Sequence, residues 1–212
     1  NTIIVVPGAN GKVDRAYIDS IKSELEKFDM VVLQHEIPLE TVHYVIEFCY
    51  EKGIKIVLNP APAAAVPMEI IDKVTYVTPN EHEAVLIFGD ELSTEDLLRK
   101  YPEKLVITQG SRGVSTCLKD GQILNVPARK AQVVDTTGAG DTLNGAFSVQ
   151  IAEGKAIEDA LAYANVAASL STEKFGAQTG MPTAEEVETA LKILNGESVE
   201  KEIPVEMELI TK

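Results

Sequence analysis

Apolar residues follow two alternating patterns along this chain. Short runs rich in β-branched residues predict buried strands at residues 3–6, 30–33, 55–58, 74–77 and 105–108. Between these runs, apolar residues recur every three or four positions, which predicts amphipathic helices at residues 13–27, 39–52 and 80–88. Gly53 stands directly after the second of these helices, at a position where helices typically end.

The second half of the chain continues the alternation. Residues 114–119 and 122–126 predict an antiparallel hairpin that turns at Asp120-Gly121. Val133-Val134 is expected to end a further strand and leads into a glycine-rich turn. More helices are expected at residues 139–153, 156–173 and 184–194. This order favours an α/β fold, in which helices cover both faces of a mostly parallel sheet.

Composition and charge narrow the class of protein. A chain of 212 residues, of which 45% are hydrophobic and 25% charged, is typical of one sizeable globular domain. The formal net charge of −14 disfavours nucleic acid as a partner, although a local nest of backbone N–H groups can still hold a nucleotide phosphate. No apolar run approaches the roughly 20 residues that span a bilayer, so we expect no membrane association.

The two cysteines give a further indication of environment. Cys49 and Cys117 lie far apart and form no CxxC pair, which predicts no structural zinc site. We expect both to be buried, reduced thiols, which suit a cytoplasmic location.

The strongest chemical signal is the run from Asp135 to Phe147, DTTGAGDTLNGAF. The small residues Gly138, Ala139 and Gly140 let the backbone approach a ligand closely. They open a predicted helix, whose first unpaired N–H groups and dipole favour an anion. Asp141 falls within that first turn. In isolation, an aspartate there would equally be a simple helix cap.

The whole run resembles the C-terminal signature of the pfkB family of carbohydrate kinases. The resemblance implies a ribokinase-like α/β/α sandwich of three layers, and an ATP-dependent phosphorylation of a sugar hydroxyl. It also implies that Asp141 is the base that accepts the hydroxyl proton. The backbone of Gly138, Ala139 and Gly140 would then stabilise the transferring phosphoryl group, a reaction that depends mainly on positioning and charge stabilisation.

Two further segments resemble the nucleotide-binding motifs of the family. Asn80-Glu81-His82-Glu83 is similar to its N-x-x-E segment, which implies that Asn80 serves the phosphates and that Glu83 holds Mg²⁺ through water. The T-x-G-x-x-G loop, which implies contacts with ATP, is matched by Thr108, Gln109, Gly110, Ser111, Arg112 and Gly113. Asn165 falls where the family contacts adenine. Each of these three assignments has a structural alternative. Residues 80–83 would equally be a solvated helix start, residues 108–113 an ordinary turn, and Asn165 a polar spacer in the core.

Other segments resemble the ribokinases within this family. They are Val6–Asn10, Glu36–Glu40 and the run Asn59-Pro60-Ala61-Pro62-Ala63. The resemblance implies that Glu36 reaches the sugar and that the substrate is D-ribose, converted to D-ribose 5-phosphate. Glu36 follows a predicted strand, at the edge of the sheet where ligands bind in open α/β folds.

The same resemblance implies a monovalent cation, usually K⁺, beside the anion site. Its expected ligands, mostly carbonyl oxygens, are Asp135, Thr137, Ser171, Lys174 and Gly176. The family often has a serine ligand just beyond, where this chain has Gly180.

Compared with the family pattern, the chain is expected to lack about the first hundred residues. Those residues would carry the first strands, a sugar-binding Gly-Gly motif and a β-sheet lid, through which the family usually forms homodimers. We expect residues 1–196 to form the catalytic domain and residues 197–212 a charged extension. By itself, the chain is expected to bind Mg-nucleotide weakly and to turn over sugar poorly.

Three other functions are consistent with parts of the pattern. The first is a kinase for another sugar or nucleoside. The second is a nucleotide-binding remnant without activity. A dinucleotide-binding dehydrogenase fits less well, because its glycine-rich turn follows the first strand and not a late one.

Overall fold

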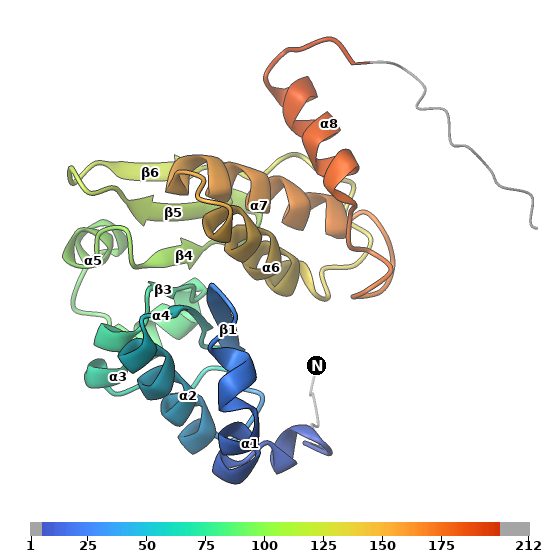
Figure 1. The fold of residues 1–212 in the computed structure, drawn as a ribbon. Coiled ribbons are helices and arrows are strands. Elements are labelled where there is room, and N and C mark those ends of the chain that lie inside the picture. The colour runs from blue at the N-terminus through green and yellow to red at the C-terminus, as the bar shows by residue number, and fades with distance from the viewer. Residues whose placement is uncertain (1–5, 200–212) are drawn as a thin grey trace, which may run out of the picture.

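The computed structural model describes residues 6–199 and has three layers, with a sheet between two groups of helices (Figure 1). The strands are β1 Met30–Gln34, β2 Lys55–Asn59, β3 Tyr76–Val77, β4 Val106–Thr108, β5 Val114–Cys117 and β6 Ile123–Val126. The α-helices are α1 Arg15–Leu25, α2 Leu39–Lys52, α3 Met68–Lys73, α4 Glu81–Phe88, α5 Thr94–Lys100, α6 Ala139–Ala152, α7 Ile157–Ser171 and α8 Ala184–Leu194. Two 3-10 helices, η1 Asn10–Lys12 and η2 Gly110–Arg112, complete the described elements.

The sheet has a parallel part and an antiparallel part. Strands β1, β2 and β3 are parallel neighbours in that order, with Val32 opposite Val57 and Leu58 opposite Val77. Strands β4, β5 and β6 are antiparallel neighbours. Parallel bridges from Val77 to Leu105 and from Asn80 to Thr108 connect the two parts. The carboxyl ends of β1 to β4 therefore lie along one edge.

Alternate side chains of the strands supply two cores. Ile56 and Leu58 of β2 point into a core shared with α1, α2 and α3, whereas Val57 points into a core shared with α6 and α7. All three side chains are fully buried, as expected for a parallel strand covered on both faces. Phe147 of α6, also fully buried, packs edge-on against Tyr76 of β3. The sandwich predicted from the alternation of strands and helices is thus confirmed.

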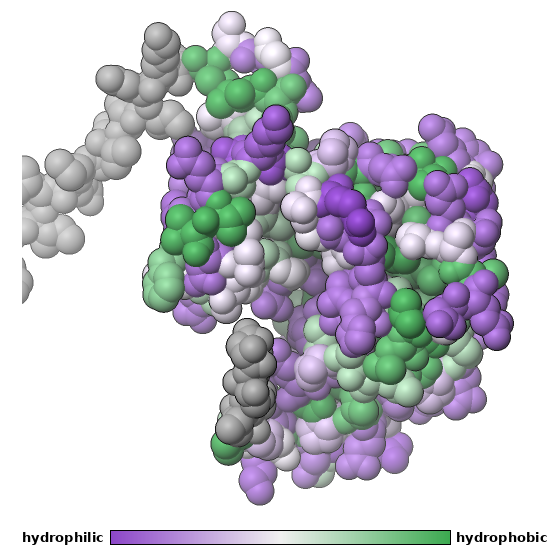
Figure 2. Space-filling model, turned by 180° about the vertical axis from the view of Figure 1, so that it is seen from behind, coloured by the Kyte–Doolittle hydropathy of each residue, from purple (hydrophilic) through white to green (hydrophobic). Residues whose placement is uncertain are grey.

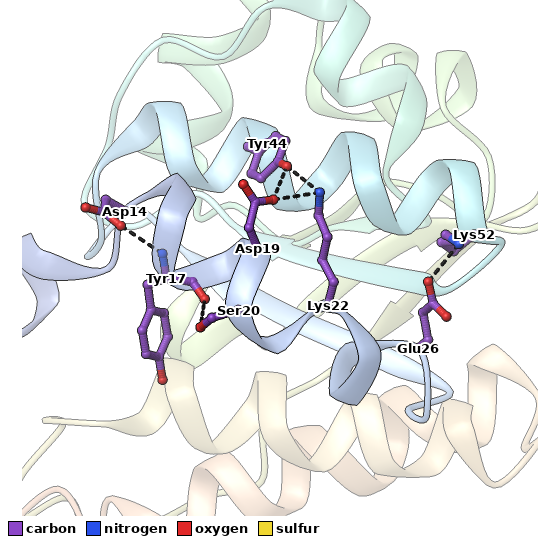
Figure 3. A network of polar contacts seen from close by, with 8 residues as sticks. All are labelled: Asp14, Tyr17, Asp19, Ser20, Lys22, Glu26, Tyr44 and Lys52. Atoms are coloured by element: carbon purple, nitrogen blue, oxygen red, sulfur yellow. Dashed lines mark hydrogen bonds and ion pairs between the residues drawn. The ribbon is translucent and has the colours of Figure 1, made fainter.

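A polar network fastens α1 to α2 (Figure 3). The Tyr44 hydroxyl of α2 donates to the Asp19 carboxylate and accepts from Lys22, both on α1. Lys22 Nζ also lies 2.7 Å from Asp19 Oδ1, and the Arg15 guanidinium stacks over the Tyr44 ring at 4.0 Å from its centroid. This cluster fixes the relative orientation of α1 and α2, which cover the same face of the sheet.

The predicted helices are found with small shifts at their ends. Gly53 ends α2 in the left-handed region with φ 70°, and the Asp120-Gly121 turn joins β5 to β6 as expected. The short helices α3 and α5 were not predicted, because six or seven residues are too few to show a clear helical period. The strand expected at 74–77 is reduced to Tyr76–Val77.

One expectation about the glycine-rich turn is wrong. No strand precedes it, since Val133 and Val134 are 62% and 61% exposed and lie in an irregular segment. The segment is held by the N–H of Val134, which donates to Thr172 O at 2.8 Å. Residues 3–5 of the strand predicted at 3–6 and most of the extension predicted at 197–212 lie outside the described residues.

The surface is mostly hydrophilic and the two cysteines are buried, as the composition and sequence predicted. Figure 2 shows hydrophilic residues over most of the rear face, with apolar residues in separate groups. Cys49 and Cys117 are both buried free thiols, as predicted, and burial raises the pKa of Cys49 to about 11. Within residues 6–199, no helix has the length and apolar character needed to cross a membrane.

Candidate active site

A pocket of about 200 Å³ opens at the carboxyl ends of the parallel strands. Each of the strands β1 to β4 ends at this pocket, and the first turn of α6 forms its opposite wall. The lining residues are Gln34, Glu36, Asn59, Ala61, Thr78, Asn80, Glu83, Thr108, Gly140, Asp141 and Asn144. Of the residues predicted from the sequence, Glu36, Asn80, Glu83, Thr108, Gly140 and Asp141 are therefore brought together.

The start of α6 presents both a carboxylate and free backbone donors. Gly138 is the N-cap, with φ 80°, and a Cβ there would lie 3.1 Å from Ala177 Cβ. The N–H of Ala139 donates to Thr136 O at 3.2 Å, whereas those of Gly140 and Asp141 find no backbone acceptor within residues 6–199. Asp141 is exposed and makes no side-chain hydrogen bond to a described residue. The N–H of Gly138 likewise finds no backbone acceptor among the described residues, so two of the three predicted donors, Gly138 and Gly140, are free.

A chain of buried polar residues supports this turn from below, and it was not recognised in the sequence. Asn144 Nδ2 donates to Gly140 O at 2.9 Å, and Asn144 Oδ1 accepts from Thr78 Oγ1 at 2.6 Å. Asn59 Nδ2 in turn donates to Thr78 O at 2.9 Å. These bonds tie the first turn of α6 to the ends of β2 and β3. The only signal in the sequence was an asparagine on the buried face of a helix.

Asn80 and Glu83 form a capping box at the start of α4. Asn80 Oδ1 accepts from the N–H of Glu83 at 2.9 Å, and Glu83 Oε2 accepts from the N–H of Asn80 at 2.8 Å. Glu83 is 6% exposed, and burial raises the pKa of its carboxyl group. The cap fixes both side chains at the edge of the pocket.

The pocket carries acidic groups without a basic partner. Its lining includes the carboxylates of Glu36, Glu83 and Asp141, and no Lys, Arg or His side chain. Within residues 6–199, no three His, Cys, Asp or Glu side chains are close enough to hold a metal ion among themselves. Such a set of oxygens suits a hard divalent cation that is completed by water and by phosphate oxygens.

Only the first residue of the predicted T-x-G-x-x-G loop lines the pocket. Gln109, Gly110, Ser111, Arg112 and Gly113 continue from β4 into η2, outside that lining. Two contacts hold this loop beside α4, because Arg112 pairs with Glu81 and Gln109 Nε2 lies 3.4 Å from Glu81 Oε1. Gly113 has φ 96°, and a Cβ there would lie 2.0 Å from Val126 O.

Asn165 has a structural function in the observed fold. The side chain is 4% exposed, and its Nδ2 donates to Pro127 O at 2.7 Å and to Val126 O at 3.3 Å. These bonds attach the end of β6 to α7. The expected contact with adenine stays a prediction.

The residues expected to hold a monovalent cation form a separate loop cluster. Asp135 Oδ1 accepts from the N–H of Thr137 at 2.9 Å and Oδ2 from the N–H of Gly176 at 3.0 Å, and these bonds lower the pKa of the carboxyl group. A Cβ built on Gly180 would lie 2.6, 2.8 and 3.5 Å from the carbonyl oxygens of Ser171, Gly176 and Lys174. Three of the expected ligands therefore converge, as carbonyls, on one point.

Comparison with known proteins decides the family. The family model for pfkB family carbohydrate kinases matches residues 1–184. The chain belongs to the pfkB family of carbohydrate kinases. The resemblance inferred from the run at 135–147 is thus confirmed.

Several relatives of this chain are ribokinases. The ribokinase of Bacillus subtilis (strain 168) is 51% identical over 191 residues, which are 90% of this chain and 64% of that protein. The ribokinase of Lactococcus lactis subsp. lactis (strain IL1403) is 47% identical over 195 residues, which are 92% of this chain and 64% of that protein. The chain thus spans less than two thirds of the length of these relatives.

Solved structures confirm the ribokinase-like fold. The ribokinase of Thermotoga maritima matches with a TM-score of 0.80 at 36% identity, over 91% of this chain and 65% of that one. The ribokinase of Arabidopsis thaliana, complexed with ribose and ATP, matches with a TM-score of 0.77 at 29% identity, over 91% of this chain and 65% of that one.

Proposed function

We propose that this protein phosphorylates a sugar hydroxyl with ATP, and that the sugar is D-ribose, which becomes D-ribose 5-phosphate. The observation that carries the proposal is the first turn of α6, where Asp141 and free N–H groups line the same pocket as Glu36. The names of the two bacterial relatives and the ribose–ATP complex of the plant ribokinase support the choice of sugar and nucleotide.

In this reaction, the carboxylate of Asp141 accepts the proton of the attacking sugar hydroxyl. The hydroxyl oxygen forms a bond to the γ-phosphorus, and the bond from that phosphorus to the bridging oxygen breaks, so that ADP leaves. The N–H groups of Gly140 and Asp141, at the positive end of the α6 dipole, stabilise the charge on the transferring group. Glu36 faces them from the end of β1 and holds the sugar.

We assign the acidic side of the pocket to Mg²⁺, which neutralises phosphate charge when it is bound. Asn80 and Glu83, fixed by the capping box, would hold it together with water and phosphate oxygens. The carbonyls of Ser171, Lys174 and Gly176, with Asp135 and Thr137 alongside, would hold K⁺ next to the anion site. ATP and buried reduced thiols both suit the cytoplasm, which is where we place the reaction.

The first test is calorimetric titration with the nonhydrolysable analogue Mg-AMP-PNP. Gly140→Asp adds a carboxylate where the phosphates are expected, and a Cβ there meets no atom within 4 Å, so the fold is preserved. We expect affinity to fall about tenfold or more. Gly145→Asp is the matched control, because it adds the same charge one turn later on α6, also in open space. Equal affinity for both variants would contradict the anion site.

The second test is sugar-dependent ADP release by the complete gene product that carries this sequence, with D-ribose compared with other pentoses, hexoses and nucleosides. Asp141→Asn keeps the size of the side chain and removes the base, so kcat should fall about 10²- to 10⁴-fold while analogue binding is retained. Preference for another substrate would overturn the assignment to ribose. An active Asp141→Asn variant would overturn the role of the base.

A further inference from the structure

His35 occupies a protected position directly behind the sugar side of the pocket. It follows Gln34, the last residue of β1, and precedes Glu36, and both of these neighbours line the pocket. His35 lies in the turn that follows β1 and, unlike its two neighbours, is not part of the pocket lining. His35 is 8% exposed, whereas Glu36 is open to solvent.

Two hydrogen bonds join His35 to the loop that follows β2. The N–H of His35 donates to Ala61 O at 2.8 Å, and its ring Nδ1 lies 3.2 Å from Pro62 O. The N–H of Ala61 donates to Asn59 O at 2.8 Å, which closes the start of the loop. Asn59 and Ala61 line the same pocket as Glu36, at the end of the neighbouring strand. His35 therefore connects the two strand ends that form this wall.

The chemistry of the ring defines which nitrogen donates. A carbonyl oxygen can only accept, so Nδ1 carries the proton toward Pro62 O, and Nε2 of the neutral ring is left with a lone pair. Nε2 is buried and has no hydrogen-bond partner among residues 6–199. Burial lowers the pKa of His35, and the nearby His43 lowers it further. The hydrogen bond to Pro62 O opposes this shift without reversing it, so the lowered pKa favours the neutral ring, whose one donor is directed at the loop.

We propose that His35 is a positioning residue for sugar binding, which sets the separation between Glu36 and Ala61 without contacting the substrate. The inference rests on the proposed function, since it assigns the wall formed by these residues to the sugar. Among the described residues, no hydrogen bond joins His35 to Asn80, Thr108 or Gly140 on the nucleotide side of the pocket. A defect at His35 is therefore specific to the sugar.

The test compares substitutions at His35 in the complete gene product. His35→Leu removes the donor and keeps an apolar volume, so the KM for D-ribose should rise about fivefold, as expected for one lost hydrogen bond. The KM for ATP should not change. His35→Asn places an amide N–H close to the position of Nδ1 and should restore the KM for ribose. His43→Leu, which removes the neighbouring imidazole on α2, should leave both constants unchanged.

Hydrogen exchange provides a readout that does not depend on activity. Amides of residues 59–63 should exchange faster in His35→Leu than in the wild type or in His35→Asn. If His35→Leu does not fold, His35→Gln takes its place, because its amide reaches the position of Nε2 and not that of Nδ1.

Unchanged exchange together with an unchanged KM for ribose would overturn the inference, and so would equal defects in His35→Asn and His35→Leu. Absence of sugar phosphorylation by the wild type would instead refute the proposed function. In that case the exchange data alone decide whether His35 holds the loop.

Discussion

At the scale of single residues, two glycines of the motifs that we assign to the nucleotide, Gly113 and Gly140, differ in whether the fold requires them. Gly113 is required by close packing, because its φ is 96° and any Cβ would overlap Val126 O. Gly140 lies in open space with an ordinary helical backbone, so nothing in the fold requires the absence of a side chain there. The sequence alone shows the same residue type at both positions.

This difference predicts opposite effects of the same substitution. Gly113→Ala should lower the free energy of unfolding by about 1–3 kcal/mol or more, because the alanine would combine a strained backbone with overpacking. Gly140→Ala should leave stability unchanged or raise it by up to about 1 kcal/mol, since alanine is the better helix former. Urea unfolding of both variants measures this. Equal destabilisation of the two would contradict the assigned roles.

At the scale of elements, helix starts are specified by short local patterns. Asn80 with Glu83 and Thr183 with Glu186 both form complete capping boxes, at the starts of α4 and α8. In α4 the box also places two pocket residues, whereas in α8 it serves the helix alone. Val187 of α8 packs against Val166 and Ala167 of α7, so the cap and this small cluster hold α8 in place.

The cap of α8 can be tested without disturbing the pocket. Thr183→Ala removes the hydroxyl that accepts from the N–H of Glu186 at 3.2 Å, and should cost about 1 kcal/mol of helix stability. Exchange of amides within residues 184–194 should accelerate about fivefold. Thr183→Ser keeps the acceptor and should behave as the wild type. An unchanged exchange rate in Thr183→Ala would show that packing on α7 alone maintains this helix.

At the scale of the whole molecule, the dominant electrostatic feature is the net charge of −14. Like charges on a compact surface repel one another and oppose folding. Exposed ion pairs such as Lys27 with Glu24, which are 65% and 63% exposed, contribute little to stability. Screening by salt therefore removes more repulsion than attraction.

We predict that thermal stability increases with ionic strength. Raising NaCl from about 0.02 M to about 0.5 M should raise the Tm by roughly 2–4 °C, which corresponds to about 1 kcal/mol for a protein of this size. Choline chloride should have the same effect, because screening does not depend on a specific cation site. A larger increase in KCl than in either salt would instead indicate cation binding near Asp135. A Tm that falls with salt would contradict the screening argument.

By itself, the sequence determined most of the helices and strands, and it placed the main motif at the start of a helix. Helical periodicity, capping residues and the turn at Asp120-Gly121 depend on interactions within a few residues, so the local pattern was sufficient to predict them. The same holds for Asp141 and the glycines before it, which one short segment brings to a helix start. The prediction of a strand at Val133-Val134 was wrong, because a β-branched pair forms a strand only where a neighbouring strand is available for hydrogen bonding.

Only the tertiary structure decided how these parts meet. Glu36, Glu83 and Asp141 come from distant segments. Glu36 and Glu83 share one pocket because parallel strands place their carboxyl ends along the same edge, and Asp141 joins them because Asn144 ties the start of α6 to Thr78. Three other contacts also depend on packing between elements. They are the hydrogen bond between Thr78 and Asn144, the close approach of Val126 O to Gly113, and the hydrogen bond of His35 with Pro62 O. Such contacts join residues far apart in the chain, and no local pattern encodes the distance between them.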